Sequence, residues 1–106
     1  MEEIRKAEIC VNGIPAGLLE ELEKKRRFRF TYLAQYQGPP ISLTMPVATR
    51  SFTFETFPPF FDGLLPEGIQ LEGLLRQAKL DRQDYFGQLL AVGADTVGAI
   101  TVRESP

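Results

Sequence analysis

The sequence of 106 residues lacks histidine altogether and contains a single cysteine, Cys10. Without histidine, Ser-His-Asp triads, histidine-based acid–base catalysis and histidine metal sites are excluded. A single cysteine excludes an internal disulfide and a zinc site built on cysteines. Because Cys10 lies inside an apolar run, we expect a buried thiol that is not reactive.

Long apolar runs and an excess of positive charge are missing as well. No apolar stretch approaches the roughly 18 residues of a membrane-spanning helix, and residues 1–6 lack the apolar segment of a secretion signal. The 12 basic and 14 acidic residues give a net charge of −2, whereas nucleic-acid-binding domains are normally basic. We therefore expect a cytoplasmic protein with no direct nucleic-acid partner and no membrane partner.

What is present is typical of one globular domain. Hydrophobic residues make up 43% of the chain and charged residues 25%, values close to those of folded proteins in general. A chain of this length supports one modest core, so we expect a single domain over residues 1–106. Met1 at the start, and no interrupted element before Pro106, favour a complete gene product.

The first half of the chain predicts antiparallel strands. Apolar and polar residues alternate over residues 4–11, and Asn12-Gly13 then favours the tight turn of a hairpin. Residues 14–19 run back, with Pro15 confined to an edge strand or to the start of a strand. Residues 18–27 have a helical composition, but the alternation over 26–33 favours a strand after a charged, solvated turn. Alternation also predicts short strands at 41–45 and 51–54.

The second half predicts helices and one closing strand. A helix over residues 59–65 starts at a proline, and Pro66-Glu67-Gly68 interrupts it. A second helix covers residues 69–79, with an apolar stripe of Leu71, Leu74, Leu75 and Ala78. The third has Asp81 as its expected N-cap and Asp84 in its first turn. Its inner face is Phe86, Leu89, Leu90 and Tyr85, Gly93 ends it, and residues 97–102 form the last strand.

Runs of strands followed by runs of helices build an α+β fold, because a parallel sheet needs the two to alternate. We predict a small antiparallel sheet, a meander or partial barrel, covered by two or three short helices and closed by a C-terminal strand.

No group of residues predicts catalysis. The glycines match no phosphate-binding loop, and the carboxylates between residues 62 and 84 lack the spacing of a calcium loop. The hydroxyls of Ser42, Thr44 and Ser51 have no base to activate them. We therefore expect a protein that is not an enzyme, with no catalytic residue, no cofactor, no metal and no small-molecule substrate.

The break between the first two helices is the candidate interaction site. Most of the apolar residues before it are expected in the core, but Ile69 lies outside the leucine stripe and is expected to be partly exposed. An apolar residue on a rigid surface turn can anchor a partner protein, although a single exposed apolar residue is also ordinary. The candidate partner-binding residues are Asp62, Gly63, Leu64, Leu65, Pro66, Glu67, Gly68, Ile69 and Leu71.

Three stretches stand in the same order and spacing as in a known family. They are Ser42-Leu43-Thr44-Met45-Pro46-Val47, Pro59-Phe60-Phe61-Asp62-Gly63-Leu64-Leu65-Pro66-Glu67-Gly68 and Val92-Gly93-Ala94-Asp95-Thr96-Val97-Gly98-Ala99-Ile100. With Val11-Asn12-Gly13 and Ala16-Gly17-Leu18, they resemble the first N-terminal subdomain of the HipA family of toxin kinases over essentially the whole chain. The ATP-binding, catalytic domain of such kinases is not in this sequence.

A free-standing chain of this kind is similar to the small HipS-like component of HipBST-type toxin–antitoxin systems. The resemblance implies an antitoxin that binds and inhibits a HipT-like Ser/Thr kinase toxin, with a HipB-like DNA-binding protein as the third member. It implies that the side carrying residues 64–71 faces the kinase active site, with Ile69 as the intruding anchor. The alternative is a structural N-terminal subdomain that provides scaffold or dimer contacts in a longer HipA-like kinase.

Overall fold

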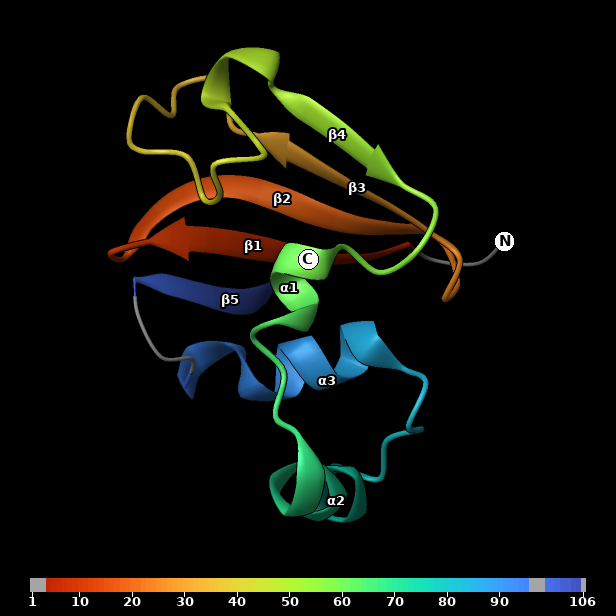
Figure 1. Cartoon of the computed structure of the whole chain (residues 1–106). Coiled ribbons are helices and arrows are strands. Elements are labelled where there is room, and N and C mark those ends of the chain that lie inside the picture. Colours follow the sequence, from red (N-terminus) through yellow and green to blue (C-terminus); the bar gives the residue numbers. More distant parts are fainter. Residues whose placement is uncertain (1–3, 96–98, 106) are drawn as a thin grey trace.

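The computed structural model describes residues 4–95 and 99–105 of the chain. Its strands form one antiparallel sheet in the order β4-β3-β2-β1-β5 (Figure 1). The strands are β1 (Arg5–Val11), β2 (Ile14–Glu23), β3 (Arg27–Tyr32), β4 (Ser51–Phe54) and β5 (Ile100–Ser105). The first four form a meander, and β5 returns to pair with β1. The predicted α+β fold, with its closing C-terminal strand, is confirmed; the sheet is open.

The hairpin of β1 and β2 forms where Asn12-Gly13 predicts it. Asn12 and Gly13 have φ angles of 51° and 81°, the left-handed values that a type I′ turn requires. β2 lies in the middle of the sheet, and it contains Pro15 because this residue stands at the start of the strand, where the register to β1 shifts. The segment with helical composition is therefore strand up to Glu23.

One face of the sheet carries the core. Side chains from all five strands meet there, the most buried being Ala7, Ile9, Leu19, Phe28, Phe30 and Val102. The opposite face carries ion pairs such as Glu20–Arg29. Cys10 is on this second face yet only 4% exposed, as the sequence predicts, and burial raises the pKa of its thiol.

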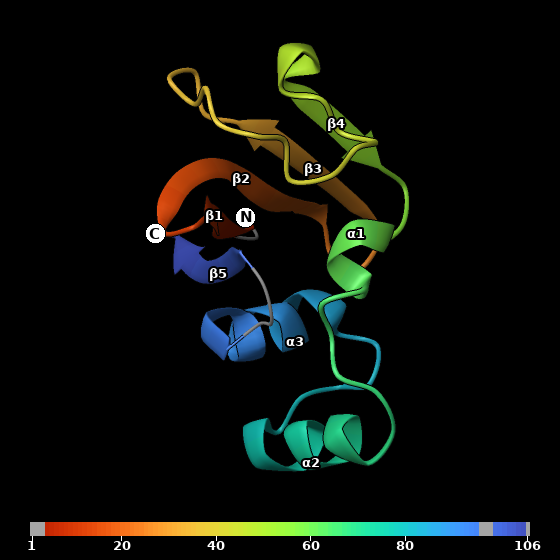
Figure 2. The ribbon, with the colours of Figure 1, turned by 60° about the vertical axis from the view of Figure 1, so that its left-hand side comes forward.

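Helices and a long loop cover the core face. α1 (Pro59–Asp62) and α3 (Tyr85–Val92) lie against the sheet, whereas α2 (Gly68–Ala78) lies beyond α3, away from it (Figure 2). Two short 3-10 turns, Val47–Thr49 and Gly93–Asp95, complete the described part. The core therefore sits between the sheet and α1 and α3, and α2 stands outside it.

Two predicted elements before the break are corrected. Residues 41–45 form a turn with one isolated bridge between Ser42 and Met45, because the hydroxyl of Tyr32 takes the backbone N–H of Ile41 that a strand would use. The first helix ends at Asp62 rather than at residue 65. Consecutive turns replace it, with the N–H of Leu65 bonded to the carbonyl of Asp62.

The ends of α3 differ from the prediction as well. Asp84, not Asp81, is the N-cap, and its carboxylate accepts the N–H of Gly87. Gly93 has an ordinary right-handed φ of −57°, and the chain continues into a 3-10 turn. Glycine is needed there because a Cβ would collide with the carbonyl oxygen of Val102 in β5. β5 begins at Ile100, and the predicted strand residues 97 and 98 lie outside the described residues.

Candidate functional site

α1 fixes the candidate site to the core. Phe61 is fully buried, with its ring centroid 6.0 Å from that of Phe30 and 5.2 Å from that of Phe60. Pro59 opens the helix and Pro58, immediately before it, is buried. Because prolines restrict φ and a large aromatic side chain fills the core beneath, the chain leaves α1 in a defined direction.

The turns after α1 are half-buried on one side and exposed on the other. The N–H of Leu64 bonds to the carbonyl of Phe61 at 3.0 Å, and Leu64 and Leu65 pack against the core as partly buried side chains. Asp62 and Gly63 are exposed. Of the predicted partner-binding residues, the two leucines therefore support the tip more than they present a surface.

The start of α2 projects an apolar side chain into solvent. Glu67 is the N-cap residue, although its side chain makes no capping hydrogen bond, and Gly68 follows with a φ of +60°. Ile69 is then 90% exposed, which confirms the exposure predicted from its place outside the leucine stripe. Among the described residues, neither Asp62 nor Glu67 has an ion-pair partner.

α2 has no buried residue at all. Its predicted stripe is only half-buried at Leu71, Leu74 and Leu75, and Ala78 is exposed. The helix ends at Ala78 and is followed by its C-cap Lys79, whose φ of 55° is left-handed. An ion pair between Glu72 and Arg82 joins α2 to the segment before α3. The site is therefore held by α1 before it and by the Glu72–Arg82 ion pair after it, and not by burial of α2.

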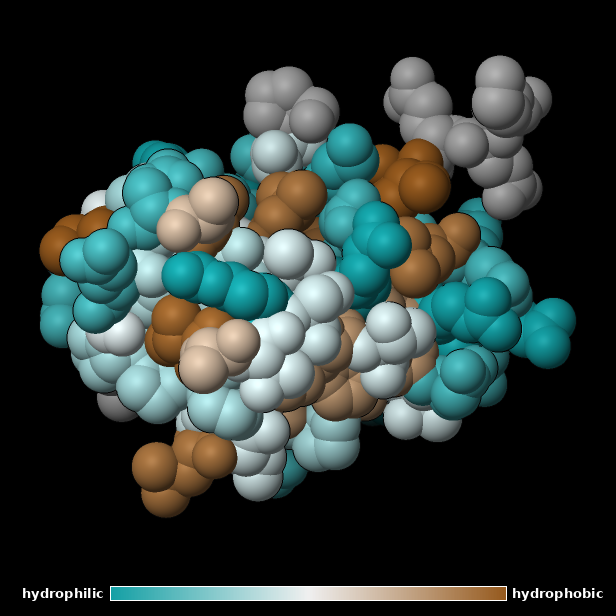
Figure 3. Space-filling model, turned by 90° about the horizontal axis from the view of Figure 1, so that it is seen from above, coloured by the Kyte–Doolittle hydropathy of each residue, from teal (hydrophilic) through white to brown (hydrophobic). Residues whose placement is uncertain are grey.

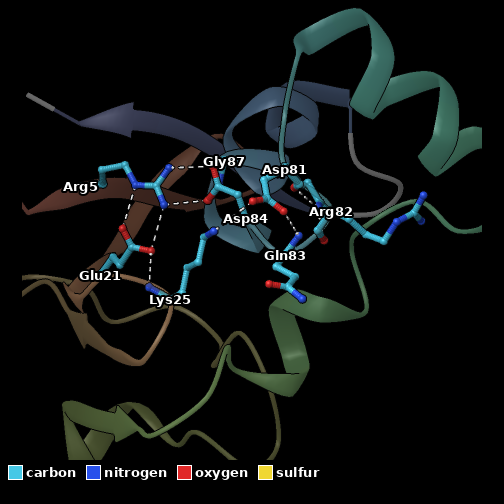
Figure 4. Close-up of polar contacts among 9 residues, drawn as sticks. Arg5, Glu21, Lys25, Asp81, Arg82, Gln83, Asp84 and Gly87 are labelled. Atoms are coloured by element: carbon cyan, nitrogen blue, oxygen red, sulfur yellow. Dashed lines mark hydrogen bonds and ion pairs between the residues drawn. The ribbon is translucent and has the colours of Figure 1, made fainter.

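A cluster of charges joins the N-terminal end of α3 to strands β1 and β2 of the sheet (Figure 4). Arg5 of β1 donates to Glu21 of β2 at 2.8 Å and to Asp84 at 2.7 Å, and its guanidinium lies 5.2 Å from the Phe86 ring centroid. Lys25 adds an exposed ion pair to Asp81 at 3.2 Å. The sequence pattern alone did not single out Arg5 or Glu21, because partners 16 residues apart leave no periodic signal.

The pKa values of this cluster follow from its geometry. Burial alone would raise the pKa of the Asp84 carboxyl, but the hydrogen bonds from Arg5 and from the Gly87 N–H outweigh burial and lower it. Gly87 permits this approach, since a Cβ there would meet the carboxylate of Asp84. The hydrogen bond to Glu21, followed by that to Asp84, raises the pKa of Arg5. The arrangement is a structural clamp in which every charge is satisfied.

Hollows elsewhere in the described part of the chain include a wide one of about 610 Å³, open to solvent, whose lining includes Glu20, Arg29 and Ser51. An apolar cavity of about 210 Å³ lies between the β1–β2 turn and residues 35–39, lined by Tyr36, Pro15 and other uncharged residues. It is smaller than the roughly 300–1,000 Å³ of typical ligand sites. In the described part of the chain, no three potential metal ligands come together, and no helix is long and apolar enough to cross a membrane.

Comparison with known proteins gives one family. A family model described as the HipA N-terminal domain matches residues 7–103. A solved structure titled as the N-terminal domain of HipA toxin superposes with a TM-score of 0.76 at 30% sequence identity, covering 100% of this chain and 97% of that one. The likeness therefore extends over the whole domain, including the tip after α1.

Two relatives differ in length. An uncharacterized protein of Haemophilus influenzae is 34% identical over 101 residues, which are 95% of this chain and 93% of that protein. A protein of Sinorhizobium fredii named "Putative kinase Y4dM" is 29% identical over 114 residues, covering 99% of this chain but 28% of its own length. The domain thus occurs both as a short protein and as a small part of a longer one.

Proposed function

Because the chain belongs to the family of HipA N-terminal domains, we propose that it is a cytoplasmic antitoxin that binds and inhibits a HipT-like Ser/Thr kinase toxin and has no catalytic activity of its own. A HipB-like DNA-binding protein is the proposed third member of the complex. The contact surface is the tip formed by residues 62–69 together with Leu71. The observation that carries the proposal is Ile69, a large apolar side chain that is 90% exposed on a tip that follows α1, the helix that buries Phe61 in the core.

Inhibition of this kind needs no chemistry from the inhibitor. A protein kinase works by positioning ATP, metal ions and the substrate hydroxyl, so a rigid side chain placed among them stops the reaction. A standard interface takes about 800 Å² from each partner, roughly an eighth of the 6852 Å² surface of this domain. Ile69 supplies an apolar anchor, and the carboxylates of Asp62 and Glu67, which have no ion-pair partner among the described residues, are available to basic groups of the partner.

The alternative function is a structural N-terminal subdomain within a longer HipA-like kinase, where it provides scaffold or dimer contacts. One observation favours it: the relative of Sinorhizobium fredii, named as a kinase, carries the matching region within a chain of which it is 28%. In such a protein, the partner surface would be the remainder of the same chain. A short kinase gene beside this one in the genome, if found, would favour the antitoxin.

The test is kinase autophosphorylation and growth arrest by the HipA-like kinase of the same organism, with and without this protein. We expect the wild type to suppress both, and Ile69→Asp to lose the suppression because it puts a charge where an apolar side chain docks. Ile14→Asp is the matched control, since Ile14 is also exposed, at 61%, but lies at the β1–β2 turn. Circular dichroism of both variants verifies that they fold.

The outcomes separate the two functions. Suppression by the wild type and by Ile14→Asp, but not by Ile69→Asp, supports an inhibitory tip. Suppression that survives Ile69→Asp keeps the antitoxin but moves its contact elsewhere. No suppression by the wild type at saturating concentration overturns the antitoxin and leaves the scaffold subdomain.

A further inference from the structure

A long stretch of this charged protein has no charge. One residue in four is charged over the chain, yet none of the 16 residues from 34 to 49 is. Most of them are exposed. In the view from above, pale side chains of intermediate hydropathy cover much of the middle of the surface, with hydrophilic ones at its left and its right (Figure 3). Depletion of charge is the compositional mark of the centre of a protein interface.

Leu43 stands at the tip of a turn in this stretch and is 97% exposed, more than any other large hydrophobic residue described. The alternating sequence predicts Leu43 on the same face as Ile41 and Met45. The structure buries those two, at 6% and 3% exposure, and turns Leu43 outward.

The turn is held rigidly. The hydroxyl of Tyr32 donates to the carbonyl of Met45 at 2.6 Å and accepts the N–H of Ile41 at 3.0 Å, so it fixes both ends of the turn. At the base of the loop, Arg50 donates to the carbonyl of Leu33 at 2.9 Å and has a φ of 71°. A left-handed non-glycine residue stores backbone strain that the surrounding contacts must hold, and a long loop without regular structure is commonly functional.

The same aromatic row carries this turn and the tip after α1. Ring centroids lie 6.0 Å apart between Phe61 and Phe30, 4.8 Å between Phe30 and Tyr32, and 5.8 Å between Tyr32 and Tyr36. The loop of residues 33–50 and α1 both lie over the core face of the sheet (Figures 1 and 2). Leu43 in this loop and Ile69, in the first turn of the helix that follows α1, are the two most exposed large apolar side chains described.

We propose that Leu43 is a second apolar anchor, which docks into an uncharged pocket of the same kinase that receives Ile69. The proposal rests on the proposed function and extends its surface from the helix break to the loop of residues 33–50. Nucleic acids and anionic lipids do not fit the uncharged stretch 34–49, because they require lysine or arginine at the contact. An uncharged protein surface fits it, and rigid presentation saves the entropy of ordering a flexible anchor.

The test is the affinity of the purified HipA-like kinase of the same organism for wild type, Leu43→Asp, Ile69→Asp, the double variant and Ile14→Asp, by calorimetry. We expect Leu43→Asp to weaken binding at least about tenfold, and Ile14→Asp to leave it within about twofold. If the anchors fill separate pockets, the fold-losses of the two single variants multiply in the double variant. Because Leu43 has almost no contacts to lose, Leu43→Asp is expected to keep the wild-type melting temperature.

Each outcome decides between the proposals. Weak binding by Leu43→Asp with intact Ile14→Asp supports the second anchor. Wild-type affinity of Leu43→Asp overturns the second anchor, while the proposed function stands on Ile69→Asp alone. If the wild-type protein itself does not bind the kinase, both the proposed function and the second anchor are overturned.

Discussion

The two longer helices of this domain are adjacent in sequence and opposite in character. α3 buries four consecutive residues, Phe86 to Leu89, and its N-cap Asp84 is clamped by Arg5 from the first strand. α2 buries none, has no side-chain cap, and is bounded by Gly68 and Lys79 in left-handed conformations. The shorter helix, α3, is thus packed into the core, whereas the longer one, α2, lies outside it.

The difference assigns separate roles to the two helices. A helix with few buried contacts contributes little to global stability and opens locally at low free energy, so selection for folding alone does not explain an ordered α2. α2 carries Ile69 in its first turn and is followed by the clamp at Asp84, a position that under the proposed function fits a helix that presents the contact surface. Substitutions in α3 should therefore change stability, and substitutions around α2 should change binding.

The largest expected effect comes from the core side of α3. Phe86 is 1% exposed and its ring is stacked 6.4 Å from that of Phe28, so Phe86→Ala should lower the free energy of unfolding by about 3–5 kcal/mol. Leu74→Ala, in half-buried α2, should cost less than about 1 kcal/mol. Urea denaturation followed by circular dichroism measures both. Equal losses would show that α2 is as much a part of the core as α3.

The second comparison is between two ion pairs. Arg5→Met leaves the carboxylate of Glu21, whose side chain is 5% exposed, without its guanidinium partner, and should cost about 2–3 kcal/mol. Arg82→Met breaks the exposed pair with Glu72 beside α2 and should cost at most about 1 kcal/mol. The same denaturation experiment measures both variants. A cost for Arg82→Met as large as for Arg5→Met would contradict the distinction between α3, which is packed into the core, and α2, which lies outside it.

Sequence patterns predict the sheet better than they predict the helix ends and the candidate site. Alternation and Asn12-Gly13 predict the hairpin because turn geometry and a half-buried face depend on neighbouring residues. The N-cap of α3 was misplaced because Asp81 and Asp84 are equally good local candidates. The choice is made by Arg5, which is 79 residues away from Asp84.

The candidate site divides in the same way. The exposure of Ile69 follows from the helical stripe that leaves it out, and is a local property. Leu43 was missed because alternation groups it with Ile41 and Met45, whereas the hydroxyl of Tyr32 bends the segment into a turn. A side chain from a preceding strand thus overrides a local period, and only the folded structure shows it.

The smallest effect tests whether α2 opens by itself. A Cβ on Gly73 meets nothing within 4 Å, so Gly73→Ala should stabilise α2 by about 0.5–1 kcal/mol and slow amide hydrogen exchange there about two- to fivefold. Gly68→Ala, at a φ of +60°, should do the reverse, because a side chain strains that conformation. The amides of α3 should exchange as in the wild type. If both variants shift α3 as much as α2, the two helices open as one unit, and α2 cannot be a presenting arm whose order is set independently of the core.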